Sequence, residues 1–286
     1  MNGKTLARAL ALSFVVACSS SSGSDGVGTV RFTTWGEEYI EKEIPAADVE
    51  DGWTIKYDKF LVVIADVSVG SKGAAPVVKM PGSKLFDMHA PGEKSVVDFS
   101  GVPAKAHDHV SYMIKPAAQD TALAEGATEA DRQLMVSGGF AVYVEARATR
   151  GTDAISYKWG FKLSTLYDNC VGEIAGKETE GTVVTNGGTD TIQLTIHGDH
   201  LYYDDLQAKE AKVRFDSIAA ADVSPKDGVV TLEELAAVKL TTIPKEKGPY
   251  GTGSAAGVAD LRQFVEALSR TVGHFRGEGE CFASAK

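Results

Sequence analysis

The sequence predicts a mainly β protein: an antiparallel β-sandwich over residues 29–200, followed by a smaller α-helical C-terminal segment over residues 201–286. Three observations support this fold class. Short segments of alternating apolar residues recur up to residue 196, Gly, Pro and Asp turns separate them without intervening strong helices, and helical spacing begins only after His200. The chain of 286 residues is 43% hydrophobic, which is enough to build a core for such a body.

The strand predictions follow from period-two alternation and from apolar runs. Trp53–Val69 contains the continuous apolar stretch Leu61–Ile64, which is typical of a central or bulged strand. Trp159 shares a strand face with Tyr157 and Phe161, which favours a place in the core. Arg150–Asp153 is short enough to be a hairpin connection. The other predicted strands are Val96–Phe99, Asp108–Ile114, Phe140–Ala148, Ile155–Ser164 and Thr189–His197.

Helical spacing appears in three places after His200. The predicted helices are Lys209–Ala221, Leu232–Val238 and Val258–Thr271, with Gly273 as the stop after the last one.

The formal charge of the whole chain is −10, from 29 Lys and Arg against 39 Asp and Glu. Such a chain repels nucleic-acid phosphates, so we expect no nucleic-acid partner.

The N-terminus has the architecture of a secretory leader. Lys4 and Arg8 precede an apolar run of roughly 10 residues, which is too short to span a bilayer. The next residues, Val15-Val16-Ala17-Cys18, resemble the lipobox of bacterial lipoproteins. The resemblance implies a signal peptide at residues 1–17, acylation of Cys18 and anchoring in the lipid bilayer. An ordinary signal peptide with an incidental cysteine is the alternative.

Residues 18–28 are rich in serine and glycine and are predicted to form a flexible tether. Lipoprotein resemblance also implies that Ser19 is compatible with the outer membrane. The expected location is therefore the bacterial cell envelope, as an outer membrane lipoprotein facing the periplasm or the cell surface. With Cys18 acylated, Cys170 and Cys281 remain as a pair in an oxidising compartment, which predicts a disulfide, although two free thiols are the alternative.

Residues 222–235 resemble the calcium loop of the EF-hand family in their C-terminal half. Gly228 takes the sharp-turn position and Glu234 the bidentate position, while Asp222 and Ser224 lie one residue too early. The resemblance implies calcium ligation by oxygens of Asp222, Ser224, Asp227, Val229, Thr231 and Glu234. The alternative is a turn followed by a capping box of Thr231 with Glu234, which needs no ion.

Histidines give a second candidate metal site, for zinc or copper. His107 and His109 are two residues apart, so both rings share one face if this segment is a strand. Three further candidates, His197, Asp199 and His200, lie at a strand end, and His274 follows the last helix. Alternatively, each ring caps a loop or bonds to a backbone carbonyl.

The sequence contains no complete catalytic template, such as a nucleophile elbow, a His-Glu-x-x-His helix or a phosphate-binding loop. The neighbouring carboxylates Glu37 and Glu38 are interpreted as solvated charges. An enzyme is therefore less expected than a binding protein. We expect a lipid-anchored envelope protein that binds calcium and a transition metal, with an envelope protein as a further possible partner. The alternatives are a zinc-dependent extracytoplasmic hydrolase using His197 and His200, and a structural or adhesive surface lipoprotein.

Overall fold

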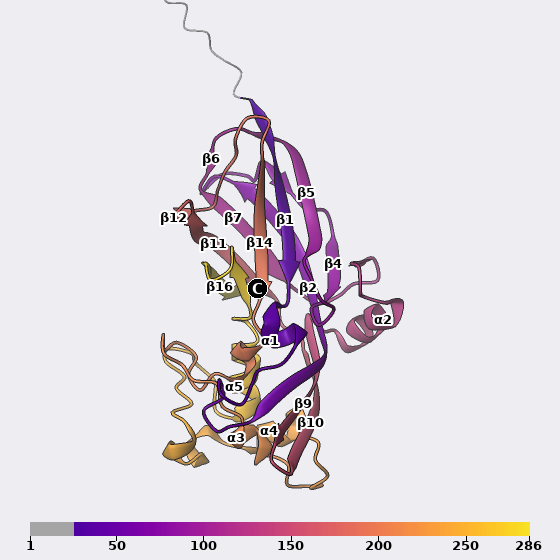
Figure 1. The fold of residues 1–286 in the computed structure, drawn as a ribbon, viewed down its shortest axis with the longest axis vertical. Coiled ribbons are helices and arrows are strands. Elements are labelled where there is room, and N and C mark those ends of the chain that lie inside the picture. The colour runs from indigo at the N-terminus through magenta and orange to yellow at the C-terminus, as the bar shows by residue number, and fades with distance from the viewer. Residues whose placement is uncertain (1–25) are drawn as a thin grey trace, which may run out of the picture.

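Two β-sheets packed face to face form the body of the computed structural model, which describes residues 26–286 (Figure 1). Inward side chains of both sheets, including Phe32, Val62 and Leu194, belong to one hydrophobic core. This confirms the predicted mainly β, sandwich-like fold with a small helical part near the C-terminus. The predicted leader, Cys18 and the tether as far as residue 25 lie outside the described residues.

The smaller sheet has four strands, and its central pair is parallel. β1 runs parallel to β14 and antiparallel to β5, while β15 lies antiparallel on the other side of β14. Because β1 and β14 run in the same direction, Trp35 at the end of β1 is paired with Thr195 near the end of β14. Both strands therefore deliver the residues that follow them to one edge of the sheet. The strand bounds are β15 (Gly273–Phe275), β14 (Thr189–Ile196), β1 (Val27–Trp35) and β5 (Lys94–Pro103).

The larger sheet has ten strands, and β2 crosses its centre. Its main path is β10 (Asp153–Phe161), β9 (Val142–Arg150), β2 (Thr54–Gly70), β7 (His109–Ile114), β11 (Thr165–Ile174) and β12 (Lys177–Glu180). Four strands pair beside this path: β3 (Val78–Lys79), β4 (Ser83–Asp87), β8 (Ala122–Leu123) and β16 (Glu280–Ala285). A separate two-stranded sheet joins β6 (Ala106–His107) to β13 (Thr182–Val183).

The continuous apolar run of β2 is explained by burial on both faces of the sheet. Val62 and Ile64 face the sandwich core, while Leu61 and Val63 belong to a second cluster that includes Met135 of α2 (Glu129–Gly138). This helix, visible outside the sheet in Figure 1, was not predicted. It starts with a capping box of Thr128 and Asp131, and it ends at a left-handed glycine, Gly139.

The β9–β10 hairpin confirms the predicted short connection after Arg150. Tyr157, Trp159 and Phe161 alternate with more exposed residues and are almost fully buried, so the core assignment of Trp159 is confirmed. Trp159 Nε1 donates a hydrogen bond to Val230 O at 2.9 Å. The predicted calcium loop is thereby fixed against the outer strand of this hairpin.

The helices of the C-terminal segment are shorter than predicted. The helix predicted over Lys209–Ala221 is reduced to α3, because the chain at Lys212 and Arg214 pairs with the backbone at Tyr202 and Asp204 instead. The other two predicted helices are present in shortened form. Their bounds are α3 (Asp216–Ala219), α4 (Leu232–Ala237) and α5 (Leu261–Leu268), and short 3-10 helices lie at Leu240–Thr242 and Lys245–Lys247.

Gly273 does not stop a helix but begins β15, and the chain then returns to the sandwich. β15 pairs with β14 of the smaller sheet, and β16 pairs with β11 of the larger one. Cys170 of β11 and Cys281 of β16 form a disulfide, which confirms the predicted pairing. The last residues thus connect the two sheets. Within residues 26–286, every helix is too short or too polar to cross a membrane.

Candidate metal centre

Three histidines meet at the edge where β14 ends. His197 follows β14 directly, and His200 lies on a 3-10 helix (Asp199–Tyr202). His274 comes from β15, where it is paired with Thr195 of β14. The backbone N–H of His197 donates to Val272 O at 2.8 Å, which closes the β14–β15 pair at this end. The strand pairing therefore brings His274 next to residues that are distant in sequence.

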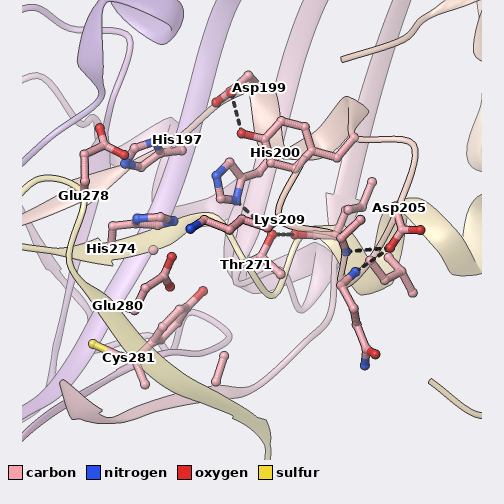
Figure 2. A pocket seen from close by; sticks show the side chains of 18 of the residues that line it. His197, Asp199, His200, Asp205, Lys209, Thr271, His274, Glu278, Glu280 and Cys281 are labelled. Atoms are coloured by element: carbon pink, nitrogen blue, oxygen red, sulfur yellow. Dashed lines mark hydrogen bonds between the residues drawn. The ribbon is translucent and has the colours of Figure 1, made fainter. Parts of the chain in front are cut away.

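The three rings are close together and almost completely buried. Their centroids are 4.1 Å apart for His197 and His274, 4.9 Å for His200 and His274, and 5.1 Å for His197 and His200. One ring nitrogen from each lies within 4.8 Å of the others. Exposed fractions are 6%, 8% and 6% for His197, His200 and His274. Figure 2 shows the rings turned toward one another at the floor of a pocket.

Hydrogen bonding leaves ring nitrogens of this cluster free. His197 Nε2 and His274 Nδ1 are buried without a hydrogen-bond partner among the described residues. Thr271 Oγ1 donates its proton to Leu268 O at 2.8 Å, so it accepts a hydrogen bond from His200 Nδ1 at 3.0 Å. That bond fixes the tautomer of His200 and leaves its Nε2 with a lone pair. Buried nitrogens without partners are costly unless a ligand satisfies them.

The protein environment keeps His197 and His200 in the neutral form that binds metals. The pKa of His197 is lowered to about 3 by burial, then by the neighbouring His274 and His200. Burial, followed by His274, lowers the pKa of His200 to about 3 as well. Neutral imidazole nitrogens are ligands for zinc and copper, so the donor set fits either ion.

Two carboxylates, Glu37 and Glu278, form a second group of donor atoms with His197. Glu37 follows β1 at the start of α1 (Glu37–Glu41), and Glu278 lies in the connection between β15 and β16. Glu37 Oε1 is 3.2 Å from His197 Nε2, but the two atoms are not aligned as a hydrogen bond. The pKa of Glu37 is raised to about 7 by burial, then by Glu278 and Asp199. Both members of the contact are therefore neutral between about pH 3 and pH 7.

Glu37 and Glu278 were not predicted as members of a site. Glu37 was interpreted as a solvated charge, yet the parallel pairing of β1 with β14 brings it beside His197. The available signal was that Glu37 lies just beyond the end of a strand, as His197 does. Parallel pairing between these two strands was not predicted.

A pocket of about 650 Å³ opens onto the three histidines. Tyr203 and Lys209 contribute to its wall, and the ring of Tyr203 lies 4.6 Å from that of His200. Asp199 also lines this pocket, where its Oδ2 accepts a hydrogen bond from the Tyr203 hydroxyl at 2.9 Å. Asp199 therefore positions Tyr203, and the described residues give it no place in either donor group.

The other two candidate histidines, His107 and His109, do not join the cluster. His107 Nε2 bonds to Pro103 O at 2.9 Å, and His109 Nε2 bonds to Asp168 Oδ1 at 2.5 Å. The two rings belong to separate strands, β6 and β7, so the shared strand face that the sequence predicts is wrong. Neither ring belongs to a group of three donor atoms among residues 26–286.

The predicted calcium residues make local hydrogen bonds. Both carboxylate oxygens of Asp222 accept backbone N–H groups, from Asp227 at 3.1 Å and Gly228 at 3.0 Å. Glu234 and Thr231 form the capping box of α4. Asp227 Oδ1 accepts from Val229 N at 3.0 Å, and Ser224 precedes Pro225 across a cis peptide bond. Calcium binding by these residues stays a prediction.

Fold and site together define a sandwich-like protein with a buried three-histidine cluster at one sheet edge. No family model matches the chain, and no curated protein matches it. Among solved structures it is similar to MbnP from Methylosinus trichosporium, with 12% sequence identity and a TM-score of 0.30, over 60% of this chain and 76% of that one. A TM-score this low does not establish a shared fold.

Proposed function

We propose that the protein is a cell-envelope binding protein that holds one transition-metal ion, zinc or copper, through His197, His200 and His274. The observation that carries the proposal is the pair of buried ring nitrogens, His197 Nε2 and His274 Nδ1, that have no hydrogen-bond partner among the described residues. A metal ion bound between the rings would satisfy both. The Thr271 hydroxyl, by holding His200 Nδ1, prepares the third ring for the same ion.

Because the three histidine rings are buried, the site favours a tightly held ion over an ion exposed to solvent and substrate. Each ring is less than a tenth exposed, and burial lowers the pKa of His197 and His200, which preserves these two donors below neutral pH. A bound ion supplies positive charge and Lewis acidity at the pocket floor. The residues of the chain orient the three rings and exclude most water from them.

Metal analysis tests the proposal directly. Protein purified without chelator should carry one zinc or copper ion per chain. His197→Ala, His200→Ala and His274→Ala should each lose it, with affinity falling by roughly 100-fold or more, since even supporting residues of metal sites are worth 10- to 100-fold. His109→Gln is the matched control, because that ring lies on β7 and bonds to Asp168. A wild-type protein without metal affinity, or three alanine variants that keep it, would contradict the proposal.

A metal-dependent hydrolase is the second candidate, and the pocket that opens onto the histidines favours it. Hydrolysis requires a coordination position open to water. The test is turnover of ester, phosphate and peptide substrates by the wild type, which should stop after EDTA treatment, return with added zinc and be absent in His274→Ala. Tight metal binding without turnover supports the binding protein instead.

Lipid anchoring through Cys18 is also part of the proposal. Its support is the lipobox-like sequence ending at Cys18 and the disulfide that pairs the other two cysteines. A disulfide is typical of proteins that fold outside the cytoplasm. Labelled palmitate should be incorporated into the wild type and not into Cys18→Ser. Equal labelling of the two proteins, or none in either, would contradict the anchor.

A further inference from the structure

The donor atoms at the sheet edge fall into two groups that share only His197. The inner group is His197, His200 and His274, and all three are buried. The outer group is Glu37, His197 and Glu278, in which Glu37 is partly exposed and Glu278 is exposed. Within each group the donor atoms lie within 4.8 Å of one another. The two carboxylates are therefore more accessible to an ion in solvent than the three rings are.

His197 is oriented toward the outer group as well as the inner one. Its side chain is about nine-tenths buried, its Nε2 has no hydrogen-bond partner among the described residues, and that atom lies 3.2 Å from Glu37 Oε1. Two ligands of one ion with bonds of about 2.0–2.2 Å are roughly 3 to 3.5 Å apart. The spacing of Glu37 Oε1 and His197 Nε2 thus suits joint coordination of a cation.

The backbone holds Glu37 in an uncommon conformation that keeps it at this edge. Its φ is 48°, a left-handed value that non-glycine residues rarely adopt outside constrained positions. The preceding residue must be glycine, because a Cβ at Gly36 would lie 2.3 Å from Met88 O. Figure 2 shows Glu278 beside His197, on the connection that leads from β15, the strand of His274. Glu278 is therefore attached to the strand that carries His274, and Glu37 follows β1, the strand that pairs with β14 beside His197.

We propose that Glu37 and Glu278 form an outer loading position that captures an incoming divalent cation and passes it to the inner three-histidine position, with His197 common to both. This inference rests on the proposed metal-binding function. Carboxylates attract a hydrated cation and replace part of its water shell, and their negative charge raises the rate of encounter. The three rings then retain the ion because they supply more of the nitrogen ligands that zinc and copper prefer.

Rapid-mixing kinetics with Zn²⁺ at pH 8 test the loading role. We expect Glu37→Gln and Glu278→Gln to slow zinc association by about tenfold, the low end of electrostatic rate effects. Equilibrium affinity should stay within about threefold, because dissociation through the same route slows in parallel. Glu38→Gln is the matched control, since it removes the same charge from an exposed neighbour that pairs with Lys42 at 2.7 Å. It should associate at the wild-type rate.

The outcomes separate this inference from the proposed function. A wild-type protein that binds no zinc overturns both. Wild-type association rates in the Glu37 and Glu278 variants overturn the loading role alone. If zinc dissociates faster from Glu37→Gln while its association rate is unchanged, Glu37 is a ligand of the inner ion, and the loading role is overturned. The loading role is also overturned if Glu38→Gln slows association as much as the two outer variants do. Slower association at nearly constant affinity, confined to the two outer carboxylates, supports it.

Discussion

The imidazole of His274 lies against that of His197, with ring centroids 4.1 Å apart, because β15 pairs with β14 beside the end of the strand that precedes His197. The contact is thus made by sheet pairing. The other ring, His200, reaches the same place by the short 3-10 helix after β14 and is held by Thr271. Stability of the β14–β15 pair and the geometry of the three-histidine cluster are consequently coupled.

We expect zinc to raise the thermal stability of the wild-type protein. Zinc at about 100 times its dissociation constant contributes about 2.7 kcal/mol to the folded state, which for a chain of this size corresponds to a melting temperature about 5–10 °C higher. Scanning calorimetry with zinc, and again after EDTA, measures the shift. His274→Ala should show no shift, and an equal shift in this variant would place the bound zinc elsewhere.

Metal-free protein should lose stability as the pH falls from 6.5 to 4.5. His197 and His200 have pKa values lowered to about 3, so unfolded histidines take up protons below about 6.5 that the folded rings do not. Glu37 acts in the opposite sense, since its pKa is raised to about 7 and its contribution is lost as the pH rises through that value. On unfolding in this pH range, His197 and His200 together take up about two protons and Glu37 releases about one. The net uptake of about one proton lowers the free energy of unfolding as the pH falls.

His200→Asn should therefore flatten the dependence of the unfolding free energy on pH within this window. Urea titrations between pH 4.5 and pH 7.5, in the presence of chelator, measure the slope for the variant, the wild type and the His109→Gln control. An unchanged slope in His200→Asn would show that His200 is not held neutral by the fold.

Removing the Cys170–Cys281 disulfide should destabilise the protein strongly. The bond joins residues separated by 111 positions, and closing a loop of this length contributes about 4 to 5 kcal/mol in the chain-entropy model. We expect Cys170→Ser/Cys281→Ser to lower the denaturant midpoint and to weaken zinc binding, because β16 continues the chain that carries His274. Cys18→Ser should leave the midpoint unchanged. Equal midpoints for the reduced and oxidised wild type would contradict this expectation.

Glu234→Ala should cost about 1 kcal/mol through loss of the capping box that starts α4. Because capping needs no ion, the loss should be the same in calcium and in EDTA. Thermal unfolding of both proteins in the two buffers provides the measurement. A calcium-dependent rise in melting temperature that is present in the wild type and absent in Glu234→Ala would instead support the EF-hand-like loop.

Local sequence patterns predicted much of the sandwich. Alternation located β9 and β10, the apolar run located β2, and the cysteine count predicted the disulfide that the fold contains. The positions of His197 and His200 at a predicted strand end, and of His274 after a predicted helix, also identified all three histidines of the cluster as candidates. These features depend on residues close in sequence or on simple pairing rules.

Features that depend on distant strand pairing were missed. The helix expected over Lys209–Ala221 forms only over Asp216–Ala219, because Asp204 accepts hydrogen bonds from Lys212 N and Arg214 Nε at 2.8 Å and 2.6 Å. β15 is short and its glycine resembled a helix stop. Glu37 gave no sign of burial, because its place beside His197 arises from the parallel pairing of β1 and β14. The convergence of His197, His200 and His274 could not be predicted either, because it depends on the pairing of β15 with β14.

Gly273 offers no donor atom, yet the geometry of the three-histidine cluster depends on its lack of a side chain. A methyl group there would lie 2.6 Å from the Tyr112 hydroxyl and 2.9 Å from the Tyr167 ring, two aromatic residues stacked beneath β15. Even alanine would push the short strand outward and draw the neighbouring imidazole of His274 away from its companions. Substitutions at Gly273 are therefore expected to disturb the cluster, although Gly273 itself carries no ligand atom.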